Sequence, residues 1–257
     1  MVFDSVAFKN VVSTGLVLDK DGRKMSKRLG NAINPFETLE EYGADPTRWY
    51  MMSNSNPWDN LKFDLAGVKE TRNKFFGTLY NTYSFFVLYA NIDKFAINEQ
   101  AVTPVEERPE IDRWIISKLY SLVKLYHTEM DNYNATPVCR AIESFVMDNL
   151  SNWYVRLCRR RFWKGEMSAD KRAAYETLYE CLNVVSQLMS PIAPFFSEFL
   201  YRNLTAPVKE AAIANNTPLR HESVHLTDLT QVEENLIDLA LEERIDYAQR
   251  ISSLVLS

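Results

Sequence analysis

The sequence predicts a mainly α-helical protein, a helical bundle preceded by a small β/α segment. Glycine supplies only 7 of the 257 residues, whereas about 7% is usual, and this scarcity disfavours barrels and sandwiches. From about residue 64 onward, apolar side chains recur at spacings of three and four, the period of an amphipathic helix. From residue 34 onward, several expected helices begin with a capping residue followed by proline, as in Asn34-Pro35 and Thr136-Pro137. A chain of this length is expected to form about two domains.

The first thirty residues have strand and turn character. Val11-Val12 and Leu16-Val17-Leu18 are β-branched or apolar, and Asp21-Gly22 is typical of a hairpin turn. Two short helices are expected next. Asn34 caps the first, which Gly43 ends, and Asp45-Pro46 begins the second by the same rule.

Longer helices are expected in the rest of the chain. Asp64 caps the first, whose apolar positions are Leu65, Val68, Phe75, Phe76, Leu79, Tyr83, Phe86 and Ala90. After a charged linker at 104–109, a helix is expected over 110–133. Thr136-Pro137 caps the next, which runs to about Trp163 with an apolar seam of Ile142, Phe145, Asn149, Leu150, Trp153 and Leu157. The remaining expectations are helices at 169–189 and 195–204, an irregular segment at 205–230, and an acidic amphipathic helix at 231–255.

The net charge of −5 conceals two basic segments on an acidic chain. Residues 1–30 carry a net +3, residues 150–172 carry +5, and residues 222–257 carry −6. This segregation suits a protein that touches polyanions at defined places, with the acidic end turned away from them.

Other classes of function are disfavoured by what the sequence lacks. Three widely spaced cysteines fit reduced thiols, and three histidines supply no zinc or triad constellation, so no metal site is expected. No apolar stretch is long enough to span a bilayer, and no signal peptide is recognisable. A cytoplasmic protein without a membrane partner is therefore expected.

The segment Lys24-Met25-Ser26-Lys27-Arg28 places three cations within five residues beside the turn. Lysine ammonium groups neutralise phosphate oxygens, and in nucleotidyl transfer they stabilise the charge that grows on the leaving pyrophosphate. Taken alone, such a segment is more often a solvated basic turn. However, the run from Gly15 to Asn31 closely resembles the second signature of class I aminoacyl-tRNA synthetases, and Pro35, Tyr42-Gly43-Ala44-Asp45, Arg48, Asp59 and Phe63-Asp64 resemble its continuation.

The resemblance assigns chemistry to this loop. It implies that Lys24 and Lys27 are catalytic and that Lys24, Met25, Ser26, Lys27 and Arg28 bind ATP, with Mg²⁺ expected in the full enzyme. The family usually has serine where this chain has Arg28, so no hydroxyl role is expected there.

A second group of cations lies at the end of the 137–163 helix. Arg156, Arg160 and Lys164 stand four apart, with Arg159 and Trp163 beside them, so they can grip phosphates and stack on an unpaired base. The alternative is that the aromatic residues are core and the arginines pair with bundle carboxylates.

The surrounding sequence favours the RNA interpretation. The runs 150–156 and 159–163 resemble the anticodon-binding domain of isoleucyl-tRNA synthetases in particular, and the runs 191–195 and 223–226 resemble that of class Ia enzymes in general. This resemblance implies the end of a catalytic domain over 1–66 and a helical anticodon-binding domain over 67–257. It also implies a monomer that uses ATP, isoleucine and tRNA(Ile).

The chain lacks the H-x-G-H signature, the nucleotide-binding βαβ unit and the editing domain of such enzymes. It is therefore expected to be a carboxy-terminal fragment that does not aminoacylate alone. The alternatives are a valyl or leucyl counterpart, a non-catalytic helical tRNA-binding module, and a helical scaffold that binds no RNA.

Overall fold

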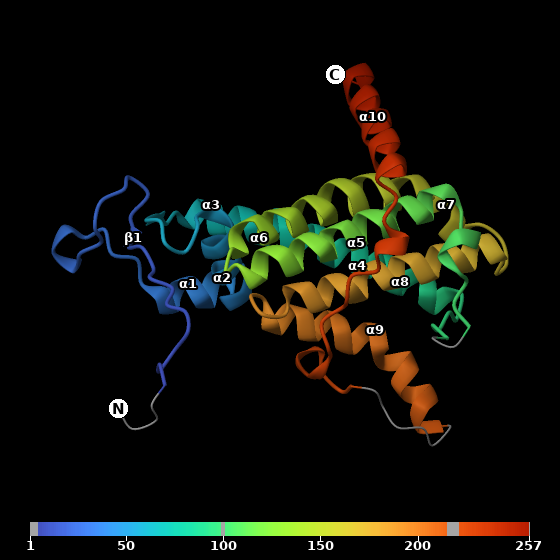
Figure 1. Ribbon diagram of the computed structural model, residues 1–257, viewed down its shortest axis with the longest axis horizontal. Helices are drawn as coiled ribbons and strands as arrows, with labels where there is room; N and C mark the ends of the chain where they lie inside the picture. Colours follow the sequence, from blue (N-terminus) through green and yellow to red (C-terminus); the bar gives the residue numbers. More distant parts are fainter. Residues whose placement is uncertain (1–4, 99–100, 215–220, 257) are drawn as a thin grey trace.

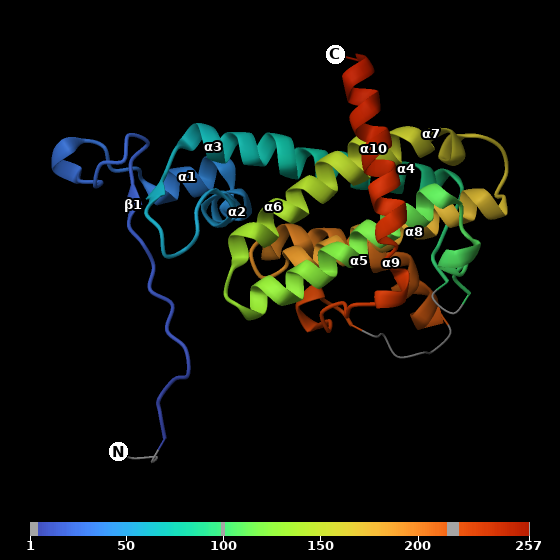
Figure 2. The ribbon, with the colours of Figure 1, turned by 45° about the horizontal axis from the view of Figure 1, so that its top comes forward.

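The computed structural model describes residues 5–98, 101–214 and 221–256. Long helices lie side by side in a bundle, the segment that contains β1 lies at one end of it, and the last helix, α10, projects away from it (Figure 1). In the turned view the C-terminal part of α10 again projects beyond the bundle (Figure 2), while its first half packs against α5. The expected mainly α-helical fold is confirmed. No helix within the described ranges is long and apolar enough to cross a membrane.

The two-stranded sheet is parallel and joins distant parts of the chain. β1 (Val17–Leu18) pairs with β2 (Leu61–Lys62), a strand that the sequence patterns did not predict. The Asp21-Gly22 turn is confirmed, with Gly22 at φ +83°. However, only one bridge, between Leu18 and Lys24, follows the turn, so a full hairpin is wrong. Val11-Val12 is exposed and forms no strand.

α1 (Pro35–Tyr42) and α2 (Ala44–Asn54) form as expected, but only one of the two predicted caps is correct. The Oδ1 atom of Asn34 accepts a hydrogen bond from the backbone of Phe36 and caps α1. The expected cap at Asp45 is wrong, because Gly43 precedes α2 and the Asp45 carboxylate accepts from the backbone N–H of Phe196 at 2.6 Å. Asp45 therefore caps a different helix, which tethers α2 to the distant α9.

α3 (Leu65–Glu70), the π-helical η2 (Thr71–Phe76) and α4 (Gly77–Ile92) form one continuous helical segment. The expected cap Asp64 is confirmed, since its carboxylate accepts from the backbone of Ala66. A short 3₁₀ turn, η3 (Val105–Glu107), lies in the charged linker before α5 (Glu110–Asp131).

The third long helix consists of α6 (Ala135–Ser144), the π-helical η4 (Phe145–Val155) and α7 (Arg156–Trp163). Thr136 is not its cap, because the Thr136 hydroxyl donates to the carbonyl of Met52 on α2 and to that of Ser55, just after α2.

The predicted apolar seam of this helix is correct at its start and wrong at its end. A π-helix places residues five apart over one another, so the buried face moves around the axis. After Leu150 the fully buried positions are Tyr154, Cys158 and Phe162, whereas Leu157 is 55% exposed.

The C-terminal part contains α8 (Ala169–Met189), α9 (Pro194–Ala214), the 3₁₀ turns η5 (Val224–Leu226) and η6 (Glu234–Leu236), and α10 (Leu239–Leu256). α9 extends beyond the predicted end at 204 because Leu204 and Thr205 are buried and the Lys209 ammonium donates to the Glu222 carbonyl. α10 begins later than expected, at a cap formed by the carboxylate of Asp238. Part of the predicted irregular segment, 215–220, lies outside the described residues.

Two clusters of buried side chains stabilise the fold. The large cluster fills the bundle and includes Trp49, Trp114 and Tyr175. The small cluster of Tyr50, Leu61, Phe63 and Val68 lies under the basic loop. Because the neighbours Trp49 and Tyr50 belong to different clusters, α2 connects the loop-bearing segment to the bundle.

Candidate functional site

The basic loop is held at its base by the buried carboxylate of Asp19. Its Oδ1 accepts hydrogen bonds from the backbone N–H groups of Asp21 at 3.0 Å and Arg23 at 2.7 Å. Its Oδ2 accepts from the Nδ2 of Asn31 at 2.8 Å. These hydrogen bonds hold the pKa of Asp19 below its ordinary value, and the bond from Asn31 has the largest effect. One carboxylate thus ties the turn before the loop to the residue after it.

Asn31 completes this arrangement from the other end of the loop. Its Oδ1 accepts from the backbone N–H of Ser26 at 2.9 Å, and its Nδ2 also donates to the carbonyl of Lys24 at 3.2 Å. We call Asp19 and Asn31 the loop clamp. Neither residue is predicted by charge or spacing, although both lie within the run from Gly15 to Asn31 that resembles the family signature.

The five residues expected to bind ATP divide into two kinds. Lys24, Lys27 and Arg28 are exposed. Met25 is partly buried against the small core cluster, and the Ser26 hydroxyl accepts from the backbone of Arg28, capping the 3₁₀ turn Lys27–Leu29. The loop therefore presents three exposed cations and fixes its own backbone with the two residues between them.

The five residues expected to contact RNA lie together on the exposed side of α7 and just beyond its end. We call them the basic patch, which consists of Arg156, Arg159, Arg160, Trp163 and Lys164. Within the described ranges, none of its four cations forms an ion pair. The Trp163 ring is 52% exposed, and one edge meets Tyr89 of α4 at 6.4 Å between centroids.

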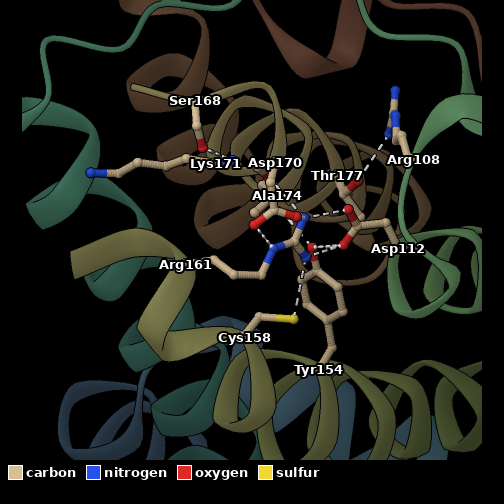
Figure 3. A network of polar contacts seen from close by, with 10 residues as sticks. All are labelled: Arg108, Asp112, Tyr154, Cys158, Arg161, Ser168, Asp170, Lys171, Ala174 and Thr177. Atoms are coloured by element: carbon tan, nitrogen blue, oxygen red, sulfur yellow. Dashed lines mark hydrogen bonds and ion pairs between the residues drawn. The ribbon is translucent and has the colours of Figure 1, made fainter. Parts of the chain in front are cut away.

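Arg161, in the middle of this cationic run, points the other way, into the bundle (Figure 3). Its two terminal nitrogens donate to the two oxygens of Asp112 at 2.6 and 2.7 Å. The hydroxyl of Tyr154 donates to the same carboxylate at 2.7 Å, and Asp112 is 0% exposed. Arg161 also contacts Asp170 of α8.

This network joins three helices, α5, α7 and α8 (Figure 3). Burial, and then the Asp112 charge, raises the pKa of Tyr154 far above its ordinary value, so the phenol stays a hydrogen-bond donor. The alternative interpretation, in which arginines of this helix pair with bundle carboxylates, therefore describes Arg161, whereas the patch arginines form no ion pair with any described residue. Arg161 fixes α7 so that these residues face outward.

Hydrogen bonds between α6 and α2 join the loop-bearing segment to the bundle. The Arg140 guanidinium donates to the carbonyls of Ser53 at 2.8 Å and Asn54 at 3.1 Å, the last carbonyls of α2. The Trp49 indole donates to the carboxylate of Glu143 at 2.7 Å. The described residues contain no group of three or more side chains arranged to hold a metal ion.

Two family models match the chain, in the order in which the two sites occur. The model "tRNA synthetases class I (I, L, M and V)" matches residues 1–64, which include the basic loop. The model "Anticodon-binding domain of tRNA ligase" matches residues 112–257, which include the basic patch. The chain belongs to the tRNA ligases that carry this anticodon-binding domain.

Within that class, the chain is highly similar to isoleucine–tRNA ligases, as the sequence motifs predicted. The enzyme of Cytophaga hutchinsonii is 56% identical over 99% of this chain and 22% of its own length. That of Bacteroides thetaiotaomicron is 55% identical over 100% and 21%, and that of Thermus thermophilus is 43% identical over 94% and 22%. The chain spans about a fifth of the length of these relatives.

Solved structures share the fold at lower identity. The ternary complex of Agrobacterium radiobacter K84 agnB2 LeuRS with tRNA and LeuAMS superposes with a TM-score of 0.63 at 19% identity, over 88% of this chain and 24% of that one. The methionyl-tRNA synthetase of Mycobacterium tuberculosis in complex with methionyl-adenylate gives 0.57 at 23% identity, over 69% and 35%. These likenesses support the helical-bundle architecture.

Proposed function

We propose that this chain is part of an isoleucine–tRNA ligase and supplies two of its working surfaces. The parent enzyme would join isoleucine to tRNA(Ile) with ATP, releasing AMP and pyrophosphate. The isoleucine–tRNA ligases of the three organisms named above align with 94–100% of this chain. We assign residues 1–66 to the end of the catalytic domain and residues 67–257 to the anticodon-binding domain. We expect a cytoplasmic monomer that does not aminoacylate without the rest of the enzyme.

The tRNA surface in this proposal is the basic patch. The observation that supports it is the contrast within one helix. Arg161 is 14% exposed and ion-paired, whereas Arg156, Arg159 and Arg160 are exposed and form no ion pair with the residues that the structure describes. Unpaired guanidinium groups beside an exposed indole supply both phosphate contacts and a stacking surface for a base.

The ATP surface in this proposal is the loop. Lys24 and Lys27 would neutralise the triphosphate, and Lys27 would meet the charge that develops on pyrophosphate as isoleucyl-adenylate forms. Arg28 adds a third cation, and Met25 and Ser26 hold the loop backbone. Mg²⁺, bound with the nucleotide in the full enzyme, would share the phosphate charge.

Binding of tRNA(Ile) by this chain tests the first surface. Replacing Arg156 and Arg160 together by alanine should weaken binding and flatten the dependence of log K on log salt. The slope should fall by up to about 1.8, because each phosphate contact on a duplex contributes about 0.9. Replacing Arg244 and Arg250 on acidic α10 removes the same charge and should leave the slope as it is. An unchanged slope in the Arg156/Arg160 variant, with the fold intact, would contradict the phosphate contacts.

Isoleucine-dependent ATP–pyrophosphate exchange in the full-length enzyme tests the second surface. Lys27→Ala should slow exchange by about two orders of magnitude, the loss of roughly 3 kcal/mol expected for one transition-state contact. The KM for isoleucine should change little, since the lysine does not touch the amino acid. Lys20→Ala, an exposed lysine in the neighbouring turn, is the matched control.

The melting temperature of this chain should stay constant on Lys27→Ala, because an exposed lysine contributes little to stability. Exchange at the wild-type rate would leave Lys27 as a surface charge. If Lys27→Ala unfolds the chain, Lys27 has a structural role and not a catalytic one. Exchange that depends on valine or leucine instead of isoleucine would favour the other class Ia enzymes.

A further inference from the structure

A cavity of about 870 Å³ lies where the loop-bearing segment meets the bundle. Its walls come from the end of α1, the start of α2, the η2–α4 junction and the start of α9. Neither the loop nor the basic patch contributes a lining residue. Its volume is within the roughly 300–1,000 Å³ of small-molecule sites.

Aromatic rings dominate the open side of this cavity. Phe195 is 70% exposed, Tyr80 is 48% exposed and Phe199 is 41% exposed. The centroids of the Tyr80 and Phe199 rings lie 6.2 Å apart, with 27° between the ring planes, and the centroids of the Phe196 and Phe199 rings lie 6.1 Å apart. Large aromatic surfaces left in water beside a cavity indicate a binding site more often than single exposed apolar residues do.

The cavity is lined by an exposed cation, Arg72, by the amide of Asn73 and by the carboxylate of Asp45. The Arg72 guanidinium is exposed and uses one nitrogen to donate to the Glu41 carbonyl at 3.2 Å, and the Asn73 amide beside it is exposed. The Arg48 guanidinium lies 5.5 Å from the centroid of the Phe195 ring. Asp45, the acidic residue among the described lining side chains, is already bonded to Arg48 and to the backbone of Phe196.

We infer that this cavity binds an unpaired nucleotide of an RNA partner, with the base stacked on Phe195 or between the other rings. This inference rests on the proposed tRNA-binding function and adds a third contact between the loop and the patch. Every base has a face that stacks on an aromatic ring, while guanidinium and amide donors match base edges and phosphate. An apolar protein segment would use the rings but offer no hydrogen-bond acceptor to the exposed Asn73 amide or to the remaining guanidinium nitrogens of Arg72.

The test compares tRNA(Ile) binding by matched variants of this chain. Phe195→Leu keeps an apolar side chain without an aromatic face and should weaken binding about tenfold with an unchanged salt slope, because stacking carries no charge. Arg72→Gln should weaken binding and lower the slope by up to about 0.9. Phe36→Leu, an equally conservative change at an exposed phenylalanine of α1 outside the cavity, should bind as wild type. Phe195 is exposed, so its replacement is compatible with the fold.

A second measurement separates this inference from the proposed function. In a protein with labelled phenylalanine rings, a single-stranded RNA hexanucleotide should shift the Phe195 and Phe199 resonances, and a duplex of the same length should not. If the hexanucleotide shifts them but tRNA(Ile) does not bind, the inference stands and the proposed function fails. If Arg156/Arg160 replacement weakens tRNA binding while Phe195→Leu and the ring resonances show no effect, the inference fails and the proposed function stands. Shifts caused only by other parts of the full-length enzyme, supplied separately, would make the cavity a protein-docking surface and overturn the inference.

Discussion

Replacing Arg161 by methionine should be among the most damaging single changes in the bundle. The substitution keeps an unbranched side chain of similar length and removes the two charge-assisted hydrogen bonds to Asp112. The Asp112 carboxylate, 0% exposed, would then retain only the Tyr154 hydroxyl as a charge-stabilising side-chain donor. Removing one partner of a buried ion pair costs about 3–5 kcal/mol, because the other charge is left without compensation.

The magnitude can be bracketed with two further variants. Tyr154→Phe removes one hydrogen bond to the same carboxylate and should cost about 1.5–3 kcal/mol. Replacing Arg161 and Asp112 together by apolar residues should cost less than Arg161→Met alone, since no unpaired charge remains. Arg160→Met, one residue away and exposed, should stay within about 0.5 kcal/mol of wild type.

Urea denaturation followed by circular dichroism measures these free energies, and thermal melting gives a second reading. A loss of 3–5 kcal/mol corresponds to a fall of about 6–20 °C in Tm for a chain of this size. If Arg161→Met costs under about 1 kcal/mol, the Asp112 carboxylate is not stabilised by this pair and the reasoning is wrong. Equal costs for Arg160→Met and Arg161→Met would also remove the distinction between the structural arginine and the patch.

Asn31→Ala should raise the pKa of Asp19 toward its ordinary value, as a carboxyl NMR titration would show; an unchanged value would contradict the loop clamp. In the intact loop the lowered pKa of Asp19 stabilises the folded state above about pH 4, and this contribution is lost as the pH falls through the lowered pKa. Burial raises the pKa of Cys139 to about 12 and of Cys158 to about 11, and raises that of Cys181 as well. A thiol reagent at pH 8 should therefore label none of the three in the folded chain and all three in denaturant, and rapid labelling of the folded chain would refute their burial.

The residue patterns predicted which segments are helical better than they predicted which face of a helix is buried. Periodicity and caps such as Asn34 and Asp64 identified the helices, since these signals are local. Leu157 was placed in the core and is exposed, because the π-helical stretch before it turns the buried face toward Cys158 and Phe162. A single sequence read with one period cannot reveal that change.

Long-range contacts account for the other differences. Asp45 has the sequence signature of a cap, but its partner is the backbone of Phe196, about 150 residues away. Of the expected site residues, the patch arginines could be predicted from their spacing, and their exposure agrees with it. The loop clamp depends on the contact between Asn31 and Asp19, and the distinct role of Arg161 depends on its contact with Asp112. The spacing of residues along the chain does not show either contact.

The continuous helical segment from Leu65 to Ile92 connects the neighbourhoods of the two proposed sites. It begins directly after β2, beside the loop-bearing segment, and its far end carries Tyr89, which touches Trp163 of the basic patch. At 1.5 Å per residue it is about 40 Å long. A tilt of roughly 5° about one end would move the other by about 3.5 Å, the span of a hydrogen bond. The length of this segment thus means that a tilt of a few degrees at one end is equivalent to a whole hydrogen bond at the other.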